Sequence, residues 1–504
     1  MTQAHPPPPL ALLDLATDLL ARVVARCDTP ADIARVAAVS RIFHSSLAEE
    51  GIRLRARERG YELAEPPAGD SCDLCWLCFA AMQRESNPPM RVASSMQHSV
   101  FIDGEGRLAS CGGAGDTKLL GHDPWRGLGL FEGREAGGRP TRLPSQLGGA
   151  RAESVSVGSC FSLALAADGS VWSWGRGQGG GGWLGHAGGH YQQRPKKIEA
   201  LAGQRVVAIS AGSFSSLALT TDGAVWSWGA GGGMFSSCSL GHSDRHDHHL
   251  PTKIEALAGQ RVVAISAGDY HSLALTMDGA IWSWGEGRDG ALGHDNEQNQ
   301  QLPKKVEALS GRRVIAVSAG GGCSFALTTG GVVWSWGSGL LGTLGHGNTE
   351  KQLLPKRIDA FAGQRVIAVS ADRHTFAITA DGSAWSWGPN NLGRLGHGDT
   401  QSRSLPNKIE ALAGQRVVSV VASGCHGFAL TADGAFFSWG HHGGGGESIL
   451  GHGYPFVMGQ GVEDQLLPKK IDLWVGERPD STGPSEDGDE SNGEYSGSDS
   501  GYLS

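Results

Sequence analysis

Apolar and polar residues alternate over short stretches of this chain, and glycine-rich turns separate the stretches. In the segment 205–229, a β-branched run at 205–210 ends at Ala-Gly, and 216–220 then alternates small or polar residues with apolar ones. A period of two predicts a strand with one buried face. Asp222-Gly223 follows and favours a two-residue hairpin turn with positive φ at both central positions. Residues 224–228 then form the returning strand.

The returning strand carries a segment, Trp-Ser-Trp-Gly after an aliphatic residue, that recurs along the chain. A first copy at 108–112 has lost both tryptophans, and the last, at 436–440, has Phe for the first one. The final glycines of the copies are Gly112, Gly175, Gly229, Gly285, Gly337, Gly388 and Gly440. Such a regular period indicates repeats that cannot bury their apolar faces alone. We predict an all-β fold over 91–475, a seven-bladed β-propeller of four-stranded blades.

The two ends of the repeat region suggest how the propeller closes. The first unit opens with a Val-rich half at 91–102, and the last stops after its Trp half at 467–471. We expect the two chain ends to share one blade, because pairing them would remove exposed sheet edges.

The order of motifs within each unit is specific. Asp-Gly, Trp-Ser-Trp-Gly, Leu-Gly-His, Leu-Pro-Lys-Lys-Ile, Val-Val-Ala-Ile-Ser-Ala-Gly and Ser-Leu-Ala-Leu-Thr together resemble the regulator of chromosome condensation repeat over 91–475. The resemblance implies a seven-bladed propeller. It also implies protein partners, since the founding activity of the family is nucleotide exchange on a small GTPase bound at one propeller face. Light-sensing members carry clustered Trp after the Ala-Gly turn, and the equivalent stretches here (213–215, 269–271, 372–374 and 425–426) carry none.

Two residue types recur at one position per unit. The second Trp of each segment is expected in the blade core, because rings at alternate strand positions pack on the two blade faces. These tryptophans are Trp174, Trp228, Trp284, Trp336, Trp387 and Trp439. Each Leu-Gly-His histidine is expected to bond within its own blade, since one copy per blade is what structural repetition gives. These histidines are His186, His242, His294, His346, His397 and His452, with His122 in the first copy.

Residues 10–60 differ in kind, with an apolar stripe at helical spacing and a Thr29-Pro30 helix start. This segment resembles an F-box and departs from the pattern at Ala16 and Cys27. The resemblance implies that it docks an Skp-type adaptor, so that the propeller presents a substrate to a cullin-type ubiquitin ligase. The residues expected to bind the adaptor are Leu15, Leu19, Leu20, Val23, Ile33, Val36, Val39 and Phe43. The alternative is a helical cap that packs on the propeller.

Composition describes the remaining segments. Residues 1–9 contain a proline run and are expected to be disordered, 61–90 to form a connecting helix, and 476–504 to be a disordered acidic tail. The seven acids of the last twenty-five residues account for most of the net charge of −9. The recurring Lys pairs (196–197, 304–305 and 469–470) are interpreted as solvated loop charges, so we do not expect nucleic-acid binding.

Three candidate sites for a metal or phosphate are interpreted structurally. Cys72, Cys75 and Cys78 lack a fourth zinc ligand and lie among apolar residues, which favours a buried helix. The His and Asp cluster at 242–249 is interpreted as a solvated loop. The glycine motif at 175–180 is not followed by a helix that could bind phosphate. We therefore predict no metal, no cofactor and no catalytic residue.

The remaining features bear on compartment and function. No apolar stretch is long enough to span a bilayer, and an odd count of 9 cysteines favours reduced thiols, so we expect a cytoplasmic or nuclear protein. We predict a protein–protein interaction scaffold that recruits substrates for a ubiquitin ligase. The alternative is an exchange factor for a small GTPase.

Overall fold

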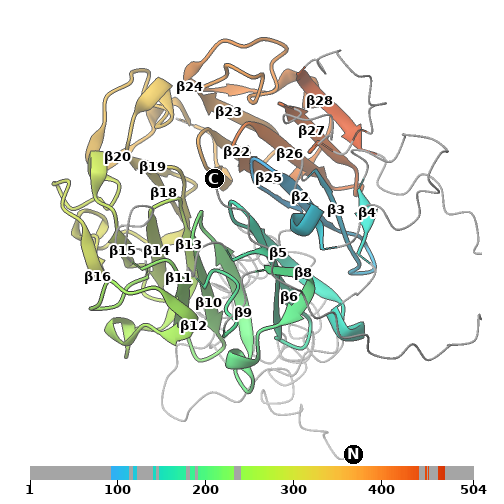
Figure 1. Cartoon of the computed structure of the whole chain (residues 1–504). Coiled ribbons are helices and arrows are strands. Elements are labelled where there is room, and N and C mark those ends of the chain that lie inside the picture. Colours follow the sequence, from blue (N-terminus) through green and yellow to red (C-terminus); the bar gives the residue numbers. More distant parts are fainter. Residues whose placement is uncertain are drawn as a thin grey trace, which may run out of the picture.

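Seven four-stranded antiparallel sheets arranged in a ring make up the described part of this computed structural model. The structure describes residues 92–112, 117–121, 140–143, 147–177, 182–187, 191–231, 240–361, 363–441, 449–450, 452 and 464–471. Every sheet uses four strands that are consecutive in the chain. Figure 1 shows the blades following one another around the ring, so that the last blade, which holds β25 and β26, lies beside blue β2 of the first. The predicted seven-bladed propeller is confirmed.

The first four blades span the N-terminal half of the ring. Blade one consists of β1 (Val92–Ser94), β2 (His98–Ile102), β3 (Leu108–Gly112) and β4 (Thr141–Arg142). Blade two consists of β5 (Ala152–Val157), β6 (Phe161–Ala166), β7 (Val171–Arg176) and β8 (Tyr191–Lys197). Blade three consists of β9 (Val206–Ala211), β10 (Ser215–Thr220), β11 (Val225–Gly229) and β12 (His248–Lys253). Blade four consists of β13 (Val262–Ala267), β14 (His271–Thr276), β15 (Ile281–Gly285) and β16 (Gln300–Lys305).

Three further blades complete the ring. Blade five consists of β17 (Val314–Ala319), β18 (Cys323–Thr328), β19 (Val333–Gly337) and β20 (Gln352–Arg357). Blade six consists of β21 (Val366–Ala371), β22 (Thr375–Thr379), β23 (Ala384–Gly388) and β24 (Arg403–Lys408). Blade seven consists of β25 (Val417–Ser423), β26 (His426–Thr431), β27 (Phe436–Gly440) and β28 (Gln465–Ile471). The first strands of neighbouring blades contact one another, so they line the axis and the fourth strands form the rim.

Short 3-10 turns occupy several loops between the strands. They are η1 (Thr117–Leu120), η2 (Leu147–Gly149), η4 (Glu199–Leu201), η5 (Glu255–Leu257), η6 (Arg288–Gly290), η7 (Glu307–Leu309), η8 (Leu340–Gly342), η9 (Asp359–Phe361) and η10 (Glu410–Leu412). Among the described residues, no helix is long and apolar enough to cross a membrane.

Neighbouring blades share their hydrophobic cores. Leu273 and Leu275 of blade four pack in one cluster with Val314 and Trp336 of blade five. The indole Nε1 of Trp336 also donates a hydrogen bond of 2.9 Å to the carbonyl oxygen of Ala291 in blade four. The equivalent bond recurs at three other blade junctions, where the donors are Trp228, Trp387 and Trp439. Each of these indoles therefore contributes apolar burial and a satisfied polar contact to the junction with the preceding blade.

The ring closes by packing between the first and last blades, and the prediction that the chain ends share a blade is wrong. β1–β4 all come from the first unit, and β25–β28 all come from the last. Cys111 takes the place of the second tryptophan in blade one, and its Sγ lies 3.3 Å from the carbonyl oxygen of Ile449 in blade seven. Ser99 Oγ donates to the same carbonyl at 2.9 Å. The short strand β4 completes the first sheet, so the first and last sheets share no strand.

The hairpins built on Asp-Gly also differ from the predicted geometry. Gly223 has a φ of 82°, whereas Asp222 is not among the residues with positive φ. Gly223 N donates to Thr220 O at 2.9 Å and Thr220 N donates to Ala224 O at 3.0 Å, which defines a three-residue loop with a glycine bulge. Asp222 contributes through its side chain, since its Oδ1 accepts a bond from Thr220 Oγ1. The expected positive φ at both central positions is wrong.

Candidate functional site

The Leu-Gly-His histidines lie in the loops after the third strand of each blade. In six blades the histidine Nε2 lies 2.9–3.0 Å from the Oγ of the serine in the Trp-Ser-Trp strand of the same blade. The same serine hydroxyl donates its hydrogen to the carbonyl oxygen of the leucine in the Leu-Gly-His motif. The histidine Nε2 is therefore the donor in the histidine–serine hydrogen bond. Burial lowers the pKa of His186, His242, His294, His346 and His397 to about 4. These rings are neutral near pH 7 and tie the loops to their blades.

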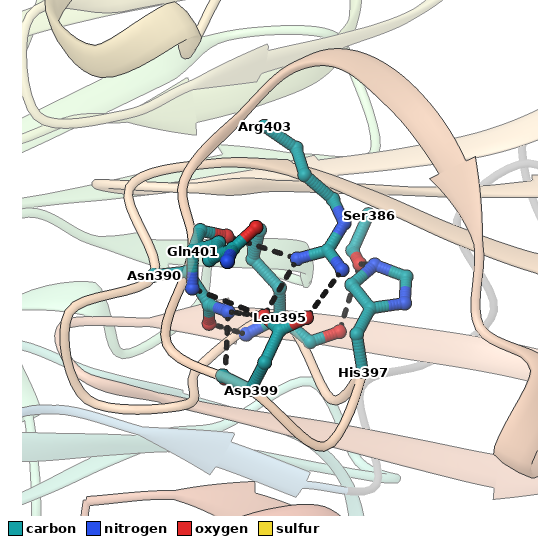
Figure 2. Close-up of polar contacts among 7 residues, drawn as sticks. All are labelled: Ser386, Asn390, Leu395, His397, Asp399, Gln401 and Arg403. Carbon is teal, nitrogen blue, oxygen red and sulfur yellow. Dashed lines mark hydrogen bonds and ion pairs between the residues drawn. The ribbon is translucent and has the colours of Figure 1, made fainter.

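The loop of blade six shows how completely such a loop is bonded within itself (Figure 2). Arg403 places Nη2 2.9 Å from Asp399 Oδ2 and Nη1 3.0 Å from Asp399 Oδ1. Asn390 Nδ2 donates to the backbone oxygen of Asp399, and Asn390 Oδ1 accepts from Leu395 N. The hydrogen bonds from Arg403 lower the pKa of Asp399 to about 2. Asp399 and Arg403 therefore neutralise each other, and these bonds hold the loop on its blade.

A different set of loops varies from blade to blade. The first strands of blades three to six are nearly identical in sequence, with Val-Val-Ala-Ile-Ser-Ala in both β9 and β13 and Val-Ile-Ala-Val-Ser-Ala in both β17 and β21. The turns that join first and second strands, here called the axial turns, do not repeat in this way. The residues at their tips are Met96, Gln97, Ser159, Cys160, Ser213, Phe214, Asp269, Tyr270, Gly321, Gly322, Asp372, Arg373, Gly424 and Cys425.

The axial turns form one continuous surface around the axis. Asp269 N donates to Gly320 O at 3.3 Å, and Gly321 N donates to Asp372 O at 3.1 Å, so successive turns touch. Gly212 permits this close approach, because a Cβ there would lie 2.4 Å from Gly268 O. Met96 and Tyr270 are 49% and 40% exposed on this surface. Variable, partly exposed side chains on a rigid and repetitive frame are typical of a recognition surface.

Two carboxylates of the axial turns approach the same glycine, and we call Asp269, Gly321 and Asp372 the acidic notch. A Cβ on Gly321 would lie 3.1 Å from Asp269 Oδ2, 3.5 Å from Arg373 Cγ and 3.8 Å from Asp372 Oδ1. The other oxygens are held in place, since Ser213 Oγ donates to Asp269 Oδ1 at 2.6 Å and Gly424 N donates to Asp372 Oδ2. Burial, followed by the charge of Asp269, raises the pKa of Asp372 to about 7. The axial surface therefore carries a titratable group near neutral pH.

Buried histidines lie directly behind the axial turns. His98 Nε2 bonds Ser162 Oγ of the next blade at 2.7 Å, and His271 Nε2 bonds Ser324 Oγ in the same way. Burial lowers the pKa of His98 to about 3 and that of His271 to about 4. These neutral rings join neighbouring blades beneath the surface.

The structure places the other predicted residues as follows. The six second tryptophans are fully buried. His242 stacks on His248 with ring centroids 4.4 Å apart, and His248 Nε2 lies 3.0 Å from Asp244 Oδ1. Within the described ranges, no group of three or more His, Cys, Asp or Glu side chains is arranged to hold a metal ion. The F-box-like segment, the three cysteines at 72–78 and His122 lie outside the described residues.

Sequence reasoning did not single out the acidic notch. Asp269 and Asp372 stood in the stretches that follow the Ala-Gly turn, and these were considered only for their lack of tryptophan. The sequence marks these two positions in one way: the turn residues differ from blade to blade, whereas the flanking strands repeat.

Comparison with known proteins finds relatives of this propeller. The model of the RCC1-like domain matches residues 232–481, and models of the regulator of chromosome condensation (RCC1) repeat match residues 168–219 and 152–180. The chain contains RCC1 repeats. Human E3 ubiquitin-protein ligase HERC2 is 35% identical over 345 residues, which cover 68% of this chain and 7% of that protein. The ultraviolet-B receptor UVR8 of Arabidopsis thaliana is 35% identical over 288 residues, 57% of this chain and 64% of that one.

Solved structures share the RCC1 propeller. Yeast RCC1 (Prp20) bound to Kap60 aligns with a TM-score of 0.60 at 21% identity, over 81% of this chain and 89% of that chain. Human WBSCR16 aligns with a TM-score of 0.59 at 24% identity, over 70% of this chain and 92% of that chain. At these identities the likeness shows the fold. The RCC1-like relatives as a group support a protein-interaction scaffold.

Proposed function

We propose that this RCC1 propeller binds a protein partner through its axial turns, and that the F-box-like segment at 10–60 links the bound partner to a ubiquitin ligase. The observation that carries the proposal is the contrast between the near-identical first strands of blades three to six and the axial turns, which differ in every blade. A rigid frame with a variable, partly exposed surface suits selective recognition of a protein. In this account the chain recruits, and ubiquitin transfer belongs to other subunits.

Two observations support a ligase context. The propeller is 35% identical to a segment of HERC2, whose name describes an E3 ubiquitin-protein ligase. The matched segment is 7% of HERC2, so the similarity concerns its RCC1 part. The F-box-like residues Leu20 and Ile33 would supply the apolar contacts to an Skp-type adaptor.

The adaptor link is tested by co-purification with the full-length chain and variants. Leu20→Asp combined with Ile33→Asp should abolish recovery of an Skp-type adaptor and a cullin, because each change puts a charge into an apolar contact. Removal of the acidic tail, 476–504, is the matched control and should leave recovery intact. Equal recovery from the wild type and the double variant would exclude the adaptor role.

The alternative function is nucleotide exchange on a small GTPase. A structure of Prp20p is described with its binding to Gsp1p and histones, and it shares this fold at 24% identity. The assay is release of a fluorescent guanine nucleotide from a small GTPase in the presence of the full-length chain. The recruiter account predicts no acceleration, whereas acceleration that depends on Tyr270 would favour exchange.

A further inference from the structure

A β-bulge recurs near the start of the first strand in blades two to seven. The register between first and second strands shifts there in each sheet, so that one residue of the first strand is left over between two paired ones. A bulge changes the direction in which the extra side chain points. We call the six residues at these bulges the bulge collar: Glu153, Val207, Val263, Ile315, Ile367 and Val418.

The bulge collar lies at the Asp-Gly end of the ring, where the first strands are held in place. Val206 N donates to Gly169 O at 3.2 Å, and Val417 N donates to Gly382 O at 3.0 Å. In both cases the Asp-Gly turn of one blade holds the first strand of the next. Because the first strands of neighbouring blades contact one another, the bulge collar surrounds the axis at the end opposite the axial turns.

Five of the six collar residues are aliphatic. Val207 is 48% exposed, whereas Ile315 is 7% exposed and the other three aliphatic residues are half-buried. Glu153 of blade two is the one charged member and is exposed. Partly exposed aliphatic side chains around one axis make an apolar surface, and covering it removes that surface from water at a gain in free energy.

The chain itself supplies an apolar segment that leads to this end of the ring. Residues 74–82, Leu-Cys-Trp-Leu-Cys-Phe-Ala-Ala-Met, carry no charge and lie outside the described residues. Followed backwards from Ser94 to Val92, β1 runs toward the Asp-Gly turn at 103–104, so the preceding chain leaves blade one at the Asp-Gly end. Residues 83–91 connect the segment to β1 and span at most roughly 30 Å. β1 contacts β5 and β25, the strands that carry Glu153 and Val418 of the bulge collar.

We propose that residues 74–82 pack on the bulge collar and thereby hold the N-terminal part of the chain at the Asp-Gly end of the propeller. An uncharged run of this length gains free energy by leaving water, and the bulge collar is an apolar surface within its reach. Trp76 and Phe79 supply the largest side chains for this contact. The inference does not depend on the proposed function, because the axial turns lie at the opposite end and stay accessible to a partner.

Photo-cross-linking of the full-length chain tests which segment covers the bulge collar. Val207→p-benzoylphenylalanine places a photoreactive group on the exposed collar residue, and trypsin releases residues 60–84 as one peptide. We expect cross-links from position 207 to this peptide within one chain. The matched control is Leu341→p-benzoylphenylalanine on η8, at a residue that is 46% exposed, and it should give no such cross-link.

A mixture of isotope-labelled and unlabelled chains separates cross-links within a chain from those between chains. Cross-links from position 207 that join only two copies of the chain would mean that a second copy covers the bulge collar, and would overturn the proposal. The absence of cross-links to residues 60–84, or equal cross-linking from position 341, would overturn it as well.

Hydrogen exchange of the full-length chain gives a second readout. Trp76→Asp combined with Phe79→Asp should raise exchange at 205–209 and 261–265 several-fold and leave β26 unchanged, because charged side chains no longer cover the bulge collar. Leu354→Asp, at a residue of β20 that is 40% exposed, is the matched control and should leave all these segments unchanged. No rise in the double variant, or an equal rise in β26, would contradict docking of residues 74–82 on the bulge collar.

Discussion

Phe101 of the first blade meets Phe428 of the last blade edge to face, with ring centroids 5.8 Å apart and planes at 75°. Phe436 approaches the same ring at 6.1 Å, and Val92 and Ile471 complete the cluster. This cluster joins the beginning of the propeller to its end. The first and last blades share no strand, so apolar contact and the hydrogen bonds to Ile449 hold the ring closed.

The closing junction should be as strong as an internal one. Phe101→Ala is expected to reduce the free energy of unfolding by about 3–5 kcal/mol, the usual cost of truncating a buried aromatic ring. Phe376→Ala is the matched control, because Phe376 of blade six packs edge to face on Trp439 of blade seven at 5.4 Å. Urea unfolding of both variants gives the comparison. A loss for Phe101→Ala much smaller than for Phe376→Ala would indicate a ring that is open at this junction.

The serine that is hydrogen-bonded to each Leu-Gly-His histidine should contribute to the free energy of unfolding. Ser386→Ala removes the partner of both His397 Nε2 and Leu395 O, leaving a partly buried donor and a buried acceptor unpaired. We expect a loss of about 1–3 kcal/mol in the free energy of unfolding. Gln401→Ala is the control in the same loop, because Gln401 bonds Asp399 and Arg403 through its backbone N and O, which the substitution keeps. This variant should stay within about 0.5 kcal/mol of wild type.

The Arg403–Asp399 ion pair of blade six should be detectable in the titration of the Asp399 carboxyl. Arg403→Gln removes both guanidinium bonds that hold the pKa of Asp399 at about 2. We expect that pKa to return toward its ordinary value of 3.8. Carbon-13 detected NMR titration of aspartate carboxyls in the wild type and the variant measures the change. An unaltered pKa would mean that the backbone bond from Gln401 N, not the arginine, sets it.

The buried histidines should make the propeller sensitive to acid. Five Leu-Gly-His rings have a pKa of about 4 in the fold against 6.5 when exposed. The unfolded chain therefore binds more protons between these values, so stability is full above pH 6.5 and falls as pH drops toward 4. The raised pKa of Asp372 has the opposite effect on how stability depends on pH, but Asp372 is one group and the histidines are five. The urea midpoint should fall between pH 7 and pH 5, and His397→Gln should make that fall shallower. A midpoint that rises on acidification would contradict the neutral state of these rings.

The sequence was sufficient to predict the number of blades and the strands within them. The spacing of Gly175, Gly229 and their equivalents reports one sheet per repeat, and the period-two pattern around Leu217 and Leu219 reports buried strands. Both signals are local and are repeated many times, so single departures do not hide them. The buried position of the second tryptophans follows from the same regularity.

The closure and the acidic notch could not be predicted in the same way. Blade one has Cys111 in place of a tryptophan and only Thr141–Arg142 as its fourth strand. The motifs therefore did not show which strands begin and end this blade. The notch brings together Asp269 and Asp372, which are two blades apart in the chain. Their approach depends on the glycines of the intervening turn, and only the curvature of the closed ring brings the three turns into contact.

The most direct test of the account is where a bound partner protects the propeller. Hydrogen exchange of the full-length chain should slow on partner binding at the axial turns, including 96–97, 213–214, 269–270 and 372–373. These segments are far apart in sequence and come together only at one end of the closed ring. The Asp-Gly turns at 222–223, 278–279, 381–382 and 433–434 lie at the opposite end of the blades and should be unchanged. Protection confined to the Asp-Gly turns, or to the outer strands of a single blade, would contradict the proposed binding face.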